Sequence, residues 1–160
     1  MKTNPWLPCL IISFTMDGAL AQVKPDDFVG NWMTSQRDGI VQLSRCALYK
    51  DAPPTALCGV VIWDINASHP SQNTPLDCNR KVFEAIKFDN GAWKGGWAFD
   101  TRSRKFHSAT LRLKDESLHV RTYVGNEVNG VTEVFTRVEE APSDCGKRAP
   151  EATSVKGVGQ

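Results

Sequence analysis

Strand-length segments separated by turn-forming residues run from Phe28 to Val138, and they constrain the fold of this chain more than any other feature. They recur about every eight to twelve residues, a spacing typical of an all-β sandwich or barrel. The predicted strands cover residues 28–34, 39–48, 57–65, 82–88, 92–100, 105–114, 117–124 and 131–138. Segment 82–88 is ambiguous between a strand and a helical turn. With it included, the sequence predicts eight antiparallel strands.

The N-terminal stretch has the layout of a secretory signal peptide. Lys2 precedes an apolar run from Leu7 to Met16, and Ala19-Leu20-Ala21 then matches the small-x-small pattern of a cleavage site. The run is about half of the roughly 20 residues that span a bilayer, and the alternative is an anchored or buried N-terminal helix. We therefore expect three parts: a signal peptide over 1–21, the β domain over 22–140 and a flexible tail over 141–160.

The cysteines agree with export. Cys9 would leave with the signal peptide, and an even number would remain: Cys46, Cys58, Cys78 and Cys145. Disulfides form in oxidising compartments, and four cysteines allow three pairings. A zinc site is the alternative, but the chain has no C-x-x-C pair and its cysteine spacings are long and irregular.

A hairpin register favours one pairing. The strands on either side of the Pro53-Pro54 turn read as antiparallel neighbours. If Cys46 lies opposite Cys58, the same register matches the apolar residues of the two strands, Leu43 with Val61 and Val41 with Trp63. We predict a Cys46–Cys58 disulfide. By elimination, Cys78 would then bridge Cys145 and tether the tail.

Charge and motifs argue against several functions. The net charge is +1, which is too small to gather nucleic acid, and no second apolar run could span a membrane. Phosphate-cradling loops, H-E-x-x-H and G-x-S-x-G are absent. The three histidines, His69, His107 and His119, lie far apart, which disfavours a shared metal site. The sequence predicts no catalytic residue, no metal and no cofactor, and therefore a protein that is not an enzyme.

Period-two alternation gives provisional inner and outer faces. One predicted strand places Trp93, Gly95, Trp97 and Phe99 on the same face, and the last places Glu133 with Phe135 and Arg137. The candidate ligand-binding residues are Trp63, Trp97, Phe99 and Tyr123, with Asp77 and Asn79 at the mouth. For Asp77-Cys78-Asn79 the alternative, which we favour, is an Asx-type turn.

Gly30-Asn31-Trp32 and Arg137 indicate how a barrel would close. Glycine allows a close backbone approach, and tryptophan can plug the base. An arginine on the last strand, beside the first in a closed barrel, can lie on the indole face. We assign barrel closure to Gly30, Trp32 and Arg137.

These residues resemble lipocalin and wider calycin barrels, and more closely the bacterial exported proteins grouped as domain of unknown function 2147. The similar stretches lie between about Phe28 and Val138, in the order 30–32, Cys46 with 57–63, 76–79, 93–97, 108–111, 123–125 and 136–138. The resemblance implies an eight-stranded, up-and-down, lipocalin-like barrel. The chain departs from the family pattern at Thr101, His107, Thr122 and Phe135.

The resemblance implies a location more than an activity. We expect a periplasmic or secreted protein, cleaved near Ala21, that binds a small, partly apolar molecule, since an eight-stranded barrel has room for one such ligand. The alternative is an envelope structural or protein-interaction module with a filled barrel. No nucleic acid and no stable membrane insertion are expected, and the oligomeric state is left open.

Overall fold

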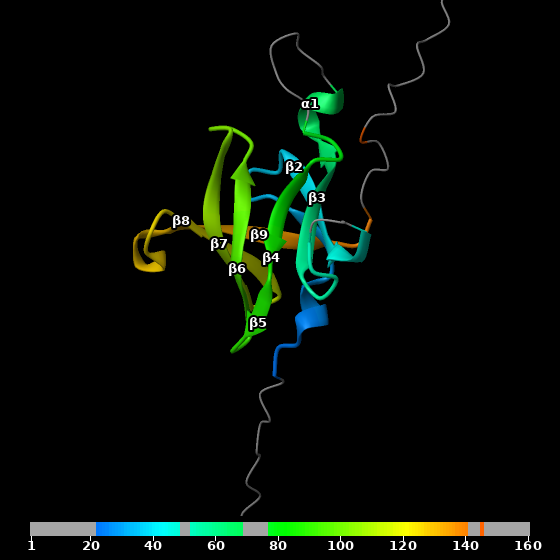
Figure 1. Ribbon diagram of the computed structural model, residues 1–160. Coiled ribbons are helices and arrows are strands. Elements are labelled where there is room, and N and C mark those ends of the chain that lie inside the picture. Colours follow the sequence, from blue (N-terminus) through cyan, green and yellow to red (C-terminus); the bar gives the residue numbers. More distant parts are fainter. Residues whose placement is uncertain (1–21, 49–51, 69–76, 141–144, 146–160) are drawn as a thin grey trace, which may run out of the picture.

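A single antiparallel sheet closes on itself in the computed structural model, which describes residues 22–48, 52–68, 77–140 and 145 (Figure 1). The order around the barrel is β4-β3-β2-β1-β9-β8-β7-β6-β5, and β4 also pairs with β6. The strands are β1 (Gly30–Met33), β2 (Gly39–Arg45), β3 (Leu57–Asp64), β4 (Lys81–Ala85), β5 (Lys87–Asp89), β6 (Ala92–Asp100), β7 (Lys105–Lys114), β8 (Ser117–Tyr123) and β9 (Val131–Val138).

The ambiguous segment 82–88 is a strand that breaks once. β4 and β5 are separated by Ile86, and both pair with β6. Ile86 keeps contact with β6 because its backbone N–H donates to the Lys94 carbonyl at 3.1 Å. Counted with β4 and β5 as one interrupted strand, the fold is the predicted eight-stranded antiparallel barrel.

Helical structure in the described residues consists of single turns at strand ends. These are the 3-10 helices η1 (Pro25–Phe28), η2 (Cys46–Leu48) and η3 (Glu127–Asn129), and the helix α1 (Ile65–Ser68). Three expected strand ends were therefore wrong, because Phe28, Cys46 and Ile65 lie in helical turns. No helix in this part of the chain is long and apolar enough to cross a membrane.

One end of the barrel is plugged by aromatic side chains, and we call it the closed end. Trp32 is fully buried, and its indole N–H donates to the Phe28 carbonyl at 2.9 Å. Trp93 is also buried, and its indole N–H donates to the Pro25 carbonyl at 3.3 Å. Helix η1 thus lies across this end and satisfies both indoles, whereas α1 lies at the opposite end of the barrel (Figure 1).

Arg137 covers the Trp32 indole at the base of the barrel, as the sequence predicts. Its guanidinium carbon lies 4.2 Å from the indole centroid, and it donates to the carbonyls of Val29 and Asp27. Gly30 has φ +135°, and a Cβ there would lie 2.5 Å from Arg137 Nη1. Glycine at position 30 is therefore favoured by its backbone angle, and it also leaves room for the guanidinium beside it.

Both expected disulfides are present, but the expected hairpin register is wrong. Cys46 bridges Cys58, and Cys78 bridges Cys145. The strand partner of Cys58 is Ser44, not Cys46. Cys46 lies in η2, just beyond β2, and reaches Cys58 diagonally over a Cα–Cα distance of 5.1 Å. Leu43 consequently pairs with Gly59, and Val41 pairs with Val61.

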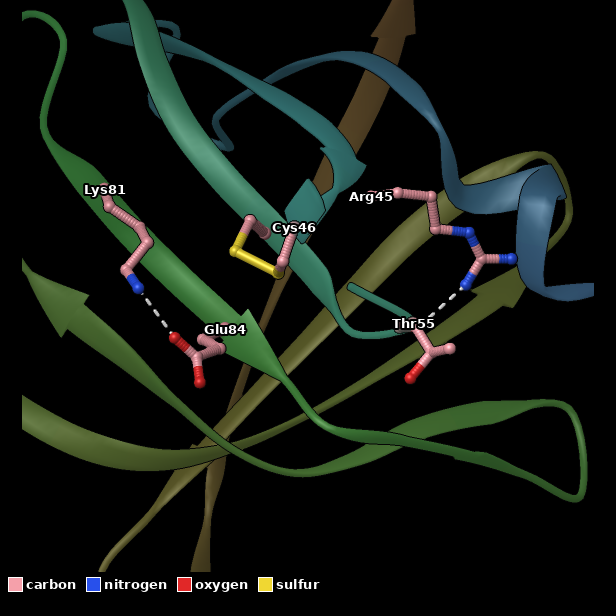
Figure 2. The surroundings of a disulfide bond; sticks show 6 residues. Arg45, Cys46, Thr55, Lys81 and Glu84 are labelled. Atoms are coloured by element: carbon pink, nitrogen blue, oxygen red, sulfur yellow. Dashed lines mark hydrogen bonds and ion pairs between the residues drawn. A yellow bond between two sulfur atoms is a disulfide. The ribbon is translucent and has the colours of Figure 1, made fainter. Parts of the chain in front are cut away.

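The Cys46–Cys58 bridge lies on the outer face of the barrel wall. Figure 2 shows it next to Lys81 and Glu84 of β4, which form an ion pair of 2.7 Å. On the other side, Arg45 donates to the Thr55 carbonyl at 3.1 Å. The two sulfurs are fully buried with Ala56 in a small cluster separate from the barrel core. This bridge therefore fixes the β2–β3 connection from outside.

Candidate functional site

A cavity of about 770 Å³ opens at the end of the barrel opposite to Trp32 and Arg137. We call this end the mouth; it is formed by residues of the β1–β2, β6–β7 and β8–β9 connections, with Asn66 and Asp77 from between β3 and β4. The inner walls are apolar, and they are contributed by Val41, Leu43, Val61, Val82, Phe83, Ala98, Leu111, Leu118, Val120 and Phe135. Polar and charged side chains are gathered toward the mouth, so the site is amphipathic.

Asp77 is the centre of an ion-pair cluster at the mouth. Asp77 is 6% exposed, and its carboxylate accepts from Arg104 Nη1 at 2.7 and 2.9 Å and from Arg80 Nε at 2.7 Å. Its backbone N–H donates to the buried carboxylate of Asp64 at 3.1 Å. Asp64 also accepts the amide N–H of Asn66 at 2.8 Å. Both buried carboxylates are thus satisfied by the protein itself, as buried charges require.

Phe99 supports the two arginines of this cluster. The guanidinium carbons of Arg80 and Arg104 lie 5.0 and 4.8 Å from the centroid of its ring. Phe99 also contacts Phe106 in a tilted pair with 4.9 Å between centroids. The β6–β7 turn is therefore held to the β3–β4 connection by charge and by cation–π contact.

A second ion pair crosses the mouth. Arg102 Nη2 lies 3.3 Å from the carboxylate of Asp38. Asp38 also accepts from the Thr34 hydroxyl at 2.6 Å, which orders the β1–β2 turn. Each of the two guanidiniums that line the cavity, those of Arg102 and Arg104, already has a carboxylate partner.

Asp100 caps the turn from which these arginines project. Burial alone would raise the pKa of its carboxyl, but hydrogen bonds from the Ser103 hydroxyl and from the amides of Arg102 and Ser103 outweigh it and lower the pKa. The Ser103 hydroxyl donates to it at 2.6 Å. Asp100 therefore orders the β6–β7 turn through local hydrogen bonds.

The predicted ligand-binding residues divide into two groups. Asp77, Phe99 and Tyr123 line the cavity, whereas Trp63, Trp97 and Asn79 do not. Asn79 has φ +61° and stands in a turn closed by the Arg80 N–H and the Asp77 carbonyl at 3.0 Å. The segment is therefore a turn, but the predicted Asx-type turn is wrong, because the Asp77 carboxylate binds arginines rather than nearby backbone amides.

Two bulges move the tryptophans away from the cavity. In β3, Val41 pairs with Val61 but Ile40 pairs with Trp63, so Ile62 is an extra residue and Trp63 takes the outer face. In β6, Trp93 pairs with Leu111 but Gly96 pairs with Ala109, so one residue is extra before Trp97. A single inserted residue exchanges the two faces of the strand, and this is why simple alternation failed for Trp63 and Trp97. Phe99 is on the same face of β6 as Trp97 but reaches the cavity at the mouth, where Arg104 lies over its ring.

Glu133 and His107 line the cavity, and neither was among the predicted ligand-binding residues. A signal for Glu133 was present in the sequence. It stands four residues before Arg137 on one strand, and residues an even number apart share a face. Placing Arg137 against Trp32 therefore also placed Glu133 inside. His107, Thr122 and Phe135, where the chain departs from the resembled pattern, all line the cavity.

Comparison with known proteins identifies the family and the fold. A family model of uncharacterized proteins conserved in bacteria, DUF2147, matches residues 30–137. Among solved structures, protein HP1028 from Helicobacter pylori, described as belonging to the lipocalin family, matches with 16% identity and a TM-score of 0.50. The match covers 74% of this chain and 85% of that chain, and at this identity it shows the fold alone. No curated protein sequence matches the chain.

The family match extends from Gly30 to Arg137, the two residues that meet at the closed end. It includes every strand of the barrel, apart from Val138 at the end of β9, and both partners of the Arg137–Trp32 contact. Since it covers well over half of the sequence, this chain belongs to the DUF2147 family of uncharacterized bacterial proteins and has the lipocalin-like barrel fold.

Proposed function

We propose that this protein is an exported, non-catalytic barrel that binds one small, partly apolar molecule in the cavity behind the mouth. The observation that carries the proposal is the cavity of about 770 Å³ with apolar walls and a polar mouth. Ligand pockets usually measure about 300–1,000 Å³ and combine apolar walls with a few polar groups.

Export is the location that best agrees with the disulfides. Both bridges join cysteines of the β domain, and the family is conserved in bacteria. Disulfides persist in the periplasm and outside the cell and are rare in the cytosol. The signal peptide expected over 1–21 lies outside the described residues, as does the expected tail except for Cys145.

A structural or protein-interaction module is the second candidate function. That role predicts a barrel filled by its own side chains, as small barrels often are. The cavity favours the ligand-binding role instead. Transfer of an apolar molecule from water into an apolar space of this size is energetically favourable.

Filling the cavity by mutation tests the proposal. Thr122 lines the cavity and is half-buried, so Thr122→Trp should place an indole inside it. Thr136 is exposed on the outer face of β9, and Thr136→Trp is the matched control. Binding of the neutral fluorescent probe N-phenyl-1-naphthylamine should fall at least about tenfold in the first variant, roughly the loss of 1.4 kcal/mol, and stay unchanged in the second.

Native mass spectrometry of the protein purified from its own host should also retain a bound molecule of low mass. Equal probe binding by both tryptophan variants, with thermal unfolding showing that both are folded, would contradict the proposal. In that case the interaction module becomes the better explanation of the fold.

A further inference from the structure

We propose that the ligand carries a cationic head group that donates hydrogen bonds, and that the Glu133 carboxylate binds it inside the cavity. This inference rests on the proposed function and adds the chemical class of the ligand. It starts from one acidic side chain whose surroundings differ from those of every other carboxylate that lines the same cavity.

Glu133 faces the interior of the barrel. It lines the cavity, as do Val131 and Phe135 on either side of it along the same face of β9. Its partner across the strand pair is Val120, which is 6% exposed and belongs to the core. A half-buried carboxylate thus interrupts an otherwise apolar part of the wall.

The Glu133 carboxylate receives few hydrogen bonds and no ion pair from the described part of the protein. The Ser35 hydroxyl donates to Oε2 at 3.4 Å, a long hydrogen bond. Within the described ranges of the chain, no lysine, arginine or histidine forms an ion pair with it. Water from the open mouth must therefore supply most of its hydrogen bonds while the cavity is empty of ligand.

The other carboxylates of the cavity have strong partners. Asp77 binds two guanidiniums, and Asp38 pairs with Arg102. Asp64 accepts two backbone amides, and Asp100 accepts the hydrogen bonds of its own turn. Of the carboxylates that line the described cavity, Glu133 is the one without a strong partner.

The cations of the cavity point to the same ligand class. Arg102 and Arg104 are each paired with an aspartate, which neutralises much of the positive charge that would otherwise attract an anionic ligand. A cationic ligand would add an ion pair with Glu133. His107 is the remaining basic side chain of the lining.

The apolar walls make this pairing strong. A ligand that fills the cavity expels the water around Glu133, and an isolated carboxylate without water or a partner is strongly disfavoured. An ammonium group on the ligand replaces that water with a charge-assisted hydrogen bond. A neutral ligand replaces it only in part, and a carboxylate would place two like charges together at low dielectric constant.

Three decyl compounds separate these cases, because they share a chain and differ in head group. Decylamine, 1-decanol and decanoate should compete with N-phenyl-1-naphthylamine at pH 7, each below its micelle concentration. We expect decylamine to bind about ten- to a hundredfold more tightly than decanol, the range for a hydrogen bond to a charged group. Decanoate should bind most weakly.

Glu133→Gln keeps the shape of the side chain and removes its charge, so it should abolish the preference for decylamine while leaving decanol affinity within about twofold. Glu116→Gln is the matched control, because Glu116 is exposed in the β7–β8 turn at the far end of the barrel. This control should retain the full preference and so exclude nonspecific attraction to acidic surface groups.

The possible results distinguish a failure of the cationic head group from a failure of the ligand-binding function. Equal affinity for decanol and decylamine, or tightest binding of decanoate, would overturn the cationic head group while leaving the ligand-binding barrel standing. A preference for decylamine that survives Glu133→Gln would overturn the assignment of the head group to Glu133. If no decyl compound and no naphthylamine probe binds, the proposed function fails and this inference fails with it.

Discussion

The two ends of this barrel are built from different kinds of side chain. At the closed end, Trp32 and Trp93 are buried, and helix η1 accepts both indole N–H groups through its carbonyls. Arg137 lies over Trp32 at the base of the barrel and donates to two further carbonyls of the same N-terminal segment. Large aromatic volume and complete hydrogen bonding leave no space there for a ligand.

The mouth has the opposite construction. Its inner wall consists mostly of Val, Leu and Ala side chains, together with Phe83 and Phe135, and charged side chains surround the opening. Its ion pairs join loops that are far apart in the sequence, as in the contact of Arg104 with Asp77. The difference indicates that the closed end supplies stability and the mouth supplies binding, and the predictions below test this division.

Removing the plug should have the largest effect. Trp32 is fully buried, so Trp32→Ala should lower the free energy of unfolding by about 3–5 kcal/mol, through lost apolar burial and the cavity left behind. Denaturant unfolding measures the loss. Trp97→Ala is the control, since Trp97 is half-buried on the outer face and should lose less. Equal losses would show that the closed end is not the stability centre.

Removing the outer bridge of the β2–β3 connection should come next. The double variant Cys46→Ser with Cys58→Ser should be less stable by about 3 kcal/mol, the loop-closure entropy expected for a loop of this size. Urea unfolding with and without the bridge gives the difference. Probe affinity of the folded protein should not change, because the bridge lies outside the barrel, and reduced affinity would link this connection to the mouth.

Arg137→Ala should destabilise the protein by about 1–3 kcal/mol, combining the cation–π contact with the packing of the side-chain stem. The guanidinium also loses its hydrogen bond to the Val29 carbonyl. Thermal unfolding reports the change, and probe binding should remain within about twofold of the unmodified protein. Unaltered stability with lost binding would instead place Arg137 in the ligand site.

The smallest effect should come from an ion pair outside the cavity, between Glu127 of η3 and Arg112 of β7. The hydrogen bond from Arg112 lowers the pKa of Glu127 below its ordinary value of 4.5, outweighing the effect of burial. The ionised form is therefore favoured by folding, and this stabilisation is present above pH 4.5 and is lost as the pH falls through the lowered pKa.

Glu127→Gln should accordingly reduce stability by at most about 1 kcal/mol near neutral pH, as for a partly exposed ion pair. The difference between the variant and the unmodified protein should disappear in acid. Unfolding measured from pH 7 down to pH 3 gives both values, and a larger loss at low pH than at neutral pH would contradict the assignment.

The closed end was predictable because it depends on a few distinctive residues at the two ends of the strand series. A glycine and a tryptophan on the first strand, with an arginine on the last, allow only one arrangement once the barrel closes. The disulfides were also predictable, because even a register error of two in the residue sum left Cys46 within reach of Cys58. The lining of the cavity was harder to predict, because it depends on which face each strand turns inward.

The sequence by itself determined the number of strands, the all-β class, the two disulfides and the residues that close the barrel, because each depends on strand period or on a few distinctive side chains. Only the tertiary structure decided the lining of the cavity. The bulges at Ile62 and before Trp97 exist only through pairing with β2 and β7, and they reverse the faces of Trp63 and Trp97. The tertiary structure also decided which groups surround the Glu133 carboxylate. Its hydrogen-bond donor, Ser35, stands 98 positions earlier and is brought close only by folding.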